Sequence, residues 1–304
     1  KNTLPIRVIA EDGSEKIYNV NVTRKQAVQN VSIFGKKFEV VDVEPTLTTS
    51  SNNTTDASGL YASTATNTGK PTYYFRGNVT NNYVKFAGQT WRIVRVNEDG
   101  TIRIITQNGI DNNESYIFNS NPKEVSSMYY TNSNVKTQLE NWYHENIESN
   151  TNLVNKVVSG NYYCEQAKVK FTDDYNYTSG NATMLVYNDY EPNFKCTSDG
   201  NNKGVVNGSV GLLTYDEVVY AGGYYEQSNS EYYLYNPSIQ WWTMSPAGFK
   251  WNYSSDWVVN PSGYLIYGGN YTGNPPCLRA VLNIDTDIQI SSGDGTKENP
   301  FVVE

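Results

Sequence analysis

Apolar and polar residues alternate along much of this chain, which is the period expected of strands with one buried face. The first case spans residues 4–24, where Ile6, Val8 and Ala10 alternate with polar residues before a Glu-Asp-Gly-Ser turn. The alternation resumes after that turn, so the segment predicts a β-hairpin. A further β segment covers residues 31–43. Because a lone hairpin is only marginally stable in water, we expect the first one to belong to a larger β unit.

Residues 46–59 form a polar, low-complexity stretch with almost nothing to bury, which is typical of a linker or long loop. Beyond it, alternation predicts strands at Tyr73–Arg76, Tyr83–Ala87, Trp91–Val96 and Thr101–Thr106. Asn97–Gly100 predicts a hairpin turn between the last two, because its glycine supplies a positive φ. The expected organisation is therefore a hairpin at 1–24, a β segment and polar linker at 25–58, and one domain at 59–304.

Two segments follow the period of a helix instead. The first covers residues 134–147, with Ser133 or Asn134 as the N-cap and one apolar stripe made of Val135, Leu139, Trp142, Tyr143 and Ile147. The second opens with a capping box, Thr214 to Glu217, and is ended by Gly222-Gly223. The remaining residues predict strands and loops. We therefore expect an α+β fold, with a β core, two short helices and a loop-rich C-terminal half.

The C-terminal part combines short strands with loops rich in Trp, Tyr, Asn and Ser. After the pair Trp241-Trp242, we expect strands at 257–259 and 264–267, joined by a Pro-Ser-Gly turn at 260–263. An apolar strand at Leu278–Ile284 follows. Adjacent residues of a strand point to opposite faces, so part of this aromatic cluster is expected to be core.

The loops 248–256 and 268–276 are predicted to emerge at the same end of the sheet, opposite the short turn, if the two strands pair antiparallel. Rigid aromatic and small polar side chains on loops between core strands are typical of binding surfaces. We therefore expect a ligand-binding surface made of Trp251, Asn252, Tyr253, Asp256, Asn270 and Tyr271.

Composition narrows the class of partner. The net charge is −8, which argues against nucleic acid or an anionic membrane, since both require a basic face. No stretch approaches 18 apolar residues, so we expect no membrane insertion by these residues. The 26 tyrosines and abundant asparagine are explained by an AT-rich bacterial genome, and they also suit an extracellular protein. Any signal peptide or anchor is expected outside this sequence, which opens within a strand-like pattern.

The chain has cysteines at Cys164, Cys196 and Cys277, without the spacing of a zinc site. Cys164 and Cys196 flank one loop-like segment, and a disulfide between them would stabilise the fold by about 3–4 kcal/mol in the chain-entropy model. Cys277 opens an apolar strand, which favours a buried free thiol. Three reduced thiols are the alternative.

Few residues here are suited to catalysis. His144, the single histidine, lies mid-helix and favours a surface position over a catalytic triad or a metal site. The paired carboxylates Asp173-Asp174, Glu98-Asp99 and Asp285/Asp287 all occur in turn-like contexts. Glu191-Pro192-Asn193 spells the tripeptide of calcium-dependent lectins, but a partner Asn-Asp pair is missing. We therefore expect no enzyme activity, no cofactor and no bound metal.

Five segments, in this order, resemble a domain family of unknown function from surface and pilin-like proteins of Gram-positive gut bacteria. They are FAGQTWRIVRVNEDGTIRII (86–105), VKTQLENWY (135–143), GLLTYDEVVYAGG (211–223), WWTMSPAG (241–248) and LRAVLNI (278–284). The resemblance covers about residues 59–304 and implies a C-type-lectin-like fold, of the kind shared with formylglycine-generating enzymes. Asn274-Pro-Pro-Cys-Leu departs from the usual lead-in to the arginine. Separately, VIAEDGSEKIYNVNVTR (8–24) resembles the last two strands of a cadherin-like β-sandwich repeat of bacterial surface proteins.

Formylglycine-generating enzymes use closely spaced cysteines, whereas the spacings here are 32 and 81 residues, so that activity is not expected. The favoured hypothesis is an extracellular, surface-attached adhesin-type module that binds a glycan or a protein of a host or neighbouring cell. A structural shaft or pilin-like subunit is the alternative, and a large apolar patch in the Tyr224–Tyr235 insertion would favour it. A carboxylate-dependent glycoside hydrolase is a minor alternative that needs two acids in one cleft.

The cysteine assignment predicts the outcome of a thiol count. Titration under denaturing, non-reducing conditions is expected to find one reactive thiol per chain, because Cys164 and Cys196 are joined and Cys277 is not. Finding three thiols would contradict the pairing and remove its support for an extracellular location.

Overall fold

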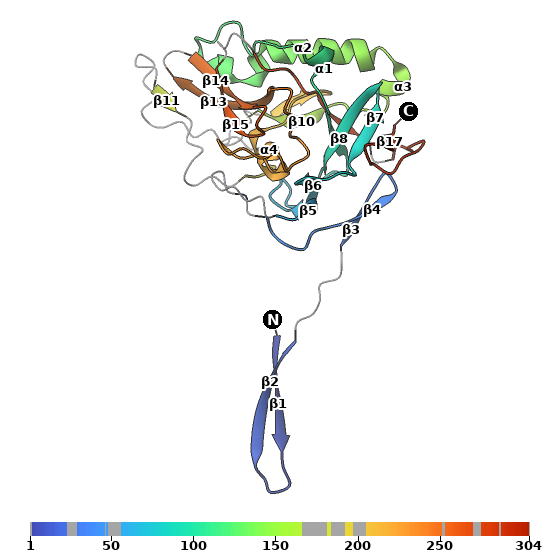
Figure 1. Cartoon of the computed structure of the whole chain (residues 1–304), viewed down its shortest axis with the longest axis vertical. Helices are drawn as coiled ribbons and strands as arrows, with labels where there is room; N and C mark the ends of the chain where they lie inside the picture. The colour runs from blue at the N-terminus through green and yellow to red at the C-terminus, as the bar shows by residue number, and fades with distance from the viewer. Residues whose placement is uncertain are drawn as a thin grey trace.

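The fold is mixed α and β, mostly sheet with few helices, which confirms the predicted class. This computed structural model describes residues 2–22, 29–45, 47, 56–165, 181–183, 192–196, 205–250, 253–269, 275–285 and 287–303. Figure 1 shows a body of packed sheets and helices, with the hairpin of β1 (Asn2–Ile9) and β2 (Glu15–Val22) standing apart from it. The hairpin predicted at 4–24 is therefore present.

The larger sheet of the body has seven strands in the order β16-β9-β8-β6-β5, with β7 paired to β8 and β17 paired parallel to β7. Its strands are β5 (Gly59–Ser63), β6 (Thr72–Arg76), β7 (Tyr83–Phe86), β8 (Gln89–Val96), β9 (Ile102–Thr106), β16 (Val281–Ile284) and β17 (Phe301–Val302). The four strands predicted between residues 73 and 106 are thus confirmed. The apolar strand predicted at 278–284 forms β16, which pairs with β9 from a much earlier part of the chain.

The second sheet has four strands in the order β11-β13-β14-β15. They are β11 (Asn181–Thr183), β13 (Trp241–Lys250), β14 (Tyr253–Val259) and β15 (Leu265–Gly269). A short ribbon of β10 (Asn161–Cys164) and β12 (Val205–Gly208) completes this half of the body. The prediction that residues 248–256 form a loop is wrong, because β13 and β14 extend through most of this segment and pair with each other.

Both predicted helices form. Ser133 caps α2 (Asn134–Tyr143) by accepting the Lys136 N–H, and the helix continues as a π-helical turn, η3 (His144–Glu148). The capping box of Thr214 and Glu217 starts α4 (Tyr215–Ala221), which ends at Gly222. The short elements α1 (Ile110–Asn113), η1 (Val125–Met128), η2 (Tyr130–Asn132) and α3 (Thr151–Val154) lie in connections. In Figure 1, α2 runs along the side of the body away from β1–β2.

The hairpin of β3 (Asn30–Ile33) and β4 (Lys36–Glu39) is part of the body and not of a separate linker. Ile33 and Phe38 are buried in the main hydrophobic core. The Val41 N–H donates to the Leu60 carbonyl, which continues the contact into β5. The described residues of the predicted 25–58 segment therefore pack on the domain that follows them.

Candidate functional site

The predicted ligand-binding residues divide into three groups. Tyr253 opens β14 and is 41% exposed. Asp256 lies inside the same strand and is fully buried. The other four, Trp251, Asn252, Asn270 and Tyr271, lie outside the described residues. The structure thus places one predicted residue on the surface and one in the interior.

The antiparallel pairing predicted for the last hairpin is present. Val259 lies opposite Leu265, and Ser255 lies opposite Gly269. The connecting turn closes through the Gly263 N–H, which donates to the Asn260 carbonyl. Tyr253 and Gly269 therefore lie at the end of the sheet away from this turn, as the sequence predicted for the residues that flank the two loops.

One face of this hairpin is aromatic. Trp257 lies directly opposite Tyr267, and the two rings stack with their centroids 4.7 Å apart. Tyr253 lies four residues before Trp257 on β14, so alternation places it on the same face. Tyr267 is 41% exposed, whereas Trp257 is buried. We call Tyr253, Trp257 and Tyr267 the aromatic face.

Two tyrosines outside the hairpin pack against the rings of this face. The Tyr215 ring, at the start of α4, lies 4.7 Å from Trp257. The Tyr225 ring meets both Trp257 and Tyr267 edge-on, at 5.6 and 5.8 Å. Such offset and edge contacts add stabilisation beyond area burial. Tyr267 is therefore an exposed ring on a fixed base. The sequence did not identify either supporting tyrosine, because both contacts join segments far apart in the chain.

Asp256 was predicted on the binding surface, but it is buried. It lies opposite Gly268 and Pro246 on the other face of the sheet. Neither carboxyl oxygen has a hydrogen-bond partner among the described residues. Burial, and then the charge of Glu165, raise the pKa of Asp256 well above its usual value. β14 starts four residues earlier than expected, and alternation then turns Asp256 inward.

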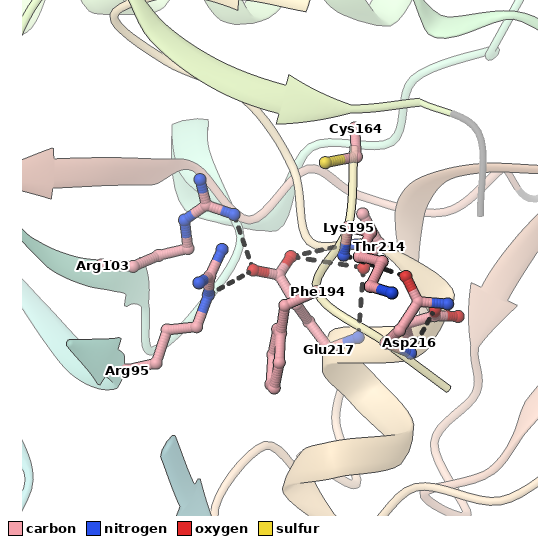
Figure 2. Close-up of a pocket in the computed structure, with 9 residues that line it drawn as sticks. Arg95, Arg103, Cys164, Phe194, Lys195, Thr214, Asp216 and Glu217 are labelled. Atoms are coloured by element: carbon pink, nitrogen blue, oxygen red, sulfur yellow. Dashed lines mark hydrogen bonds and ion pairs between the residues drawn. The ribbon is translucent and has the colours of Figure 1, made fainter. Parts of the chain in front are cut away.

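Apart from the aromatic face, a group of charged side chains surrounds the N-terminus of α4. Figure 2 shows a narrow cleft in which Arg95 and Arg103 point toward Glu217, with Cys164 and Phe194 beside them. Oε1 of Glu217 accepts from Arg95 Nε at 3.1 Å and from Arg103 Nη1 at 2.6 Å. Its Oε2 accepts the Thr214 N–H at 3.0 Å, which completes the capping box. We call these contacts the Glu217 bridge.

The Glu217 bridge is buried, with Glu217 itself only 3% exposed. Burial acts to raise the pKa of Glu217, but Arg103, Arg95 and the capping hydrogen bonds outweigh it, and the pKa lies below its usual value. The two guanidiniums also lie over aromatic rings, Arg95 over Phe194 at 4.8 Å and Arg103 over Tyr163 at 5.0 Å. Glu217 is thus an ionised structural group shared by β8, β9 and α4.

The predicted disulfide joins Cys164 to Cys196 beside this cleft, and Cys277 is a buried free thiol. The residues before Cys196 are fastened to α4. The Asn193 N–H donates to Asp216 Oδ2 at 3.0 Å, and the Tyr220 hydroxyl donates to the Pro192 carbonyl at 2.9 Å. Pro192 and Asn193, the two described residues of the lectin-type tripeptide, therefore serve to hold this segment on the helix.

The cleft is too small for an organic ligand. Its volume is about 10 Å³ at Glu217, which is roughly the space of one water. The described residues contain no cluster of three His, Cys, Asp or Glu side chains arranged to hold a metal ion. His144 is exposed on the helix surface beside Glu148, as predicted. Among the described helices, none is long and apolar enough to cross a membrane.

Comparison with protein-family models, curated proteins and solved structures found no match to this chain.

The buried Asp256 predicts a specific dependence of stability on pH. Above about pH 4 the unfolded chain loses a proton that the folded protein keeps. Stability therefore falls, by up to about 1.4 kcal/mol per pH unit, until the raised pKa of the folded state is reached. Asp256→Asn is expected to remove this slope in urea unfolding, while the exposed control Asp287→Asn retains it. A wild-type slope in Asp256→Asn would contradict the assignment.

The Glu217 bridge predicts a large effect of a small change. Glu217→Gln keeps the shape and the cap but removes the ion pairs that Glu217 makes with two buried guanidiniums, which is expected to cost about 3–5 kcal/mol. Glu140→Gln, in the exposed pair with Lys136, is the matched control and should cost no more than about 0.5 kcal/mol. The free energy of unfolding is measured in urea for both variants. An equal loss in the two would show that the Glu217 bridge stabilises the fold no more than an exposed ion pair does.

Proposed function

We propose that this protein is a non-enzymatic binding module that recognises a glycan or a protein through the aromatic face. One observation supports this most strongly. Tyr253 and Tyr267 are exposed on the same face of one hairpin, and the Tyr267 ring rests on the buried Trp257. An exposed ring on a fixed base is the arrangement that binding surfaces require.

Rings that are already held in place reduce the entropic cost of binding a ligand. A side chain that becomes immobile on binding loses conformational entropy, and a ring that is already held loses less. Planar tyrosine faces bury a large area and also offer a hydroxyl. Ser255 lies between Tyr253 and Trp257 along β14 and is partly exposed, so its hydroxyl is available beside the rings. Both an apolar face and short polar groups are thus present for a sugar ring or a peptide.

The predicted residues not described by the structure extend this proposal by sequence alone. Trp251 and Asn252 directly precede Tyr253, and Asn270 and Tyr271 directly follow Gly269. Since Tyr253 and Gly269 lie at the same end of the sheet, these residues are assigned to the same ligand site. The aromatic face would then continue past the end of the hairpin.

The alternative functions have less support. The Tyr224–Tyr235 insertion was expected to form an apolar patch if the protein were a structural subunit, but Tyr224, Tyr232 and Tyr233 are buried in the body. For a glycoside hydrolase, the acids must reach a substrate. Glu217 is occupied by two arginines, and Asp256 has no exposed surface. Neither provides a general acid in an open cleft.

We further propose that the module works outside the cell and has a C-type-lectin-like fold. A disulfide between Cys164 and Cys196 is compatible with an oxidising compartment. The acidic composition and the resemblance of the N-terminal hairpin to a surface-protein repeat favour attachment at a cell surface. No step of the proposed recognition requires a cofactor.

Binding by variants tests the proposal. The wild-type chain is first screened on glycan and cell-surface protein arrays, and Tyr253→Ala and Tyr267→Ala are then measured against each ligand found. A central ring typically contributes about 2 kcal/mol, so a loss of about 30-fold in affinity is expected. Tyr18→Ala is the matched control, because Tyr18 is 48% exposed on the remote hairpin. Full affinity in both face variants, with unchanged melting temperatures, would contradict the proposal.

A further inference from the structure

Two buried arginines have no acidic partner among the described residues. Arg92 and Arg279 are 3% and 1% exposed. The other buried arginines do have carboxylates, since Arg76 pairs with Asp56 and the Glu217 bridge holds two more. A buried charge without a counter-charge is strongly unfavourable, so this pair requires an explanation.

Arg279 lies just before β16, close enough to Arg92 of β8 for the charge of Arg92 to act on its guanidinium. Arg92 of β8 and Val281 of β16 both lie opposite Ile105 of β9, and Arg279 precedes Val281 by two residues. Alternation therefore turns both arginines to the same face. Two consecutive carbonyls cover them, because Arg92 Nη1 donates to the Tyr233 carbonyl at 3.4 Å and Arg279 Nη1 to the Leu234 carbonyl at 3.1 Å.

The remaining contacts of the pair supply no full negative charge. Arg92 also donates to the Asn82 side chain and the Val79 carbonyl, and Arg279 donates to the Thr106 carbonyl. Aromatic rings cover both, with Tyr83 3.8 Å from Arg92 and Trp241 4.9 Å from Arg279. Burial lowers the pKa of each arginine to about 10, so both remain charged at neutral pH.

Arg279 and Tyr233 each have one buried donor with no hydrogen-bond partner among the described residues. They are Arg279 Nη2 and the Tyr233 hydroxyl. Tyr233 lies next to both arginines, since its ring is 5.3 Å from the Arg92 guanidinium and its neighbour Leu234 accepts from Arg279. A buried donor without a partner requires an explanation, and a bound water or ion is one.

We propose that a small monovalent anion of the halide class binds at the Arg92–Arg279 pair, with Arg279 Nη2 and the Tyr233 hydroxyl as donors. A halide accepts several N–H and O–H groups without a fixed geometry, and it supplies the counter-charge that carbonyls and rings lack. A water molecule would satisfy the donors but would leave both charges unbalanced. The anion would fasten the Tyr233–Leu234 segment to the larger sheet.

Melting temperature and crystallography test the site together. The wild-type chain is melted at constant ionic strength while sodium gluconate is replaced by sodium chloride or sodium bromide. A saturable rise of about 2–4 °C is expected. Crystals grown in bromide should show an anomalous peak at Arg279. Equal melting in all three salts, without that peak, would overturn the proposal in favour of water.

Variants separate the site from general salt effects. Arg279→Met should abolish the halide-dependent rise, while Arg76→Met, which removes a buried arginine that has its own carboxylate, should be less stable but keep it. If Arg279→Met does not fold, Tyr233→Phe removes one donor and should shift the halide midpoint to a higher concentration. An unchanged midpoint in Tyr233→Phe together with a retained rise in Arg279→Met would place the effect elsewhere.

Discussion

The buried carboxylate of Glu217 joins the larger sheet to the start of α4. One of its oxygens accepts from Arg95 and Arg103 on neighbouring strands of the larger sheet, and the other caps α4. Any of these groups alone would be costly to bury. Because hydrogen bonds have preferred directions, their combination restricts where α4 can begin.

Two contacts of Tyr215 connect the start of α4 to the proposed binding face. Tyr215 follows the cap residue directly, and its N–H donates to the Ser245 hydroxyl of β13 at 2.9 Å. Its ring then packs on Trp257, which supports Tyr267. An exposed side chain on the outer strand of a sheet is thus connected to the interior through α4. Recognition by such a surface depends on rings that are already held in place. These contacts hold the Tyr267 ring in place.

Local sequence signals predicted much of the fold. The Thr214–Glu217 box, the Ser133 cap and the glycine turns each act within a few residues, so their physics is visible in a short window. The Cys164–Cys196 pair was also predictable, because two cysteines flank one segment. The Glu217 bridge was not, since its arginines lie 122 and 114 residues away and only tertiary packing brings them together.

The proposed binding face was predicted only in part, again because tertiary packing decides which residues lie on it. Tyr253 was correctly placed on the surface, but Asp256 was not. β14 begins at Tyr253 and pairs with β13 through a shift of register around Pro246, and Asp256 lies on its buried face. A shift of one residue exchanges the two faces of a strand, and no local pattern fixed that register here. Tyr215 and Tyr225 came from other segments altogether.

Amide hydrogen exchange of Glu217→Gln against the wild type tests most directly whether the Glu217 bridge orders the proposed binding face. The account predicts faster exchange in α4 and also in β14 and β15, because the bridge positions Tyr215 and thereby Trp257. The remote hairpin β1–β2 should exchange at an unchanged rate and serves as the internal reference. Faster exchange confined to α4, with β14 and β15 as protected as in the wild type, would contradict the account.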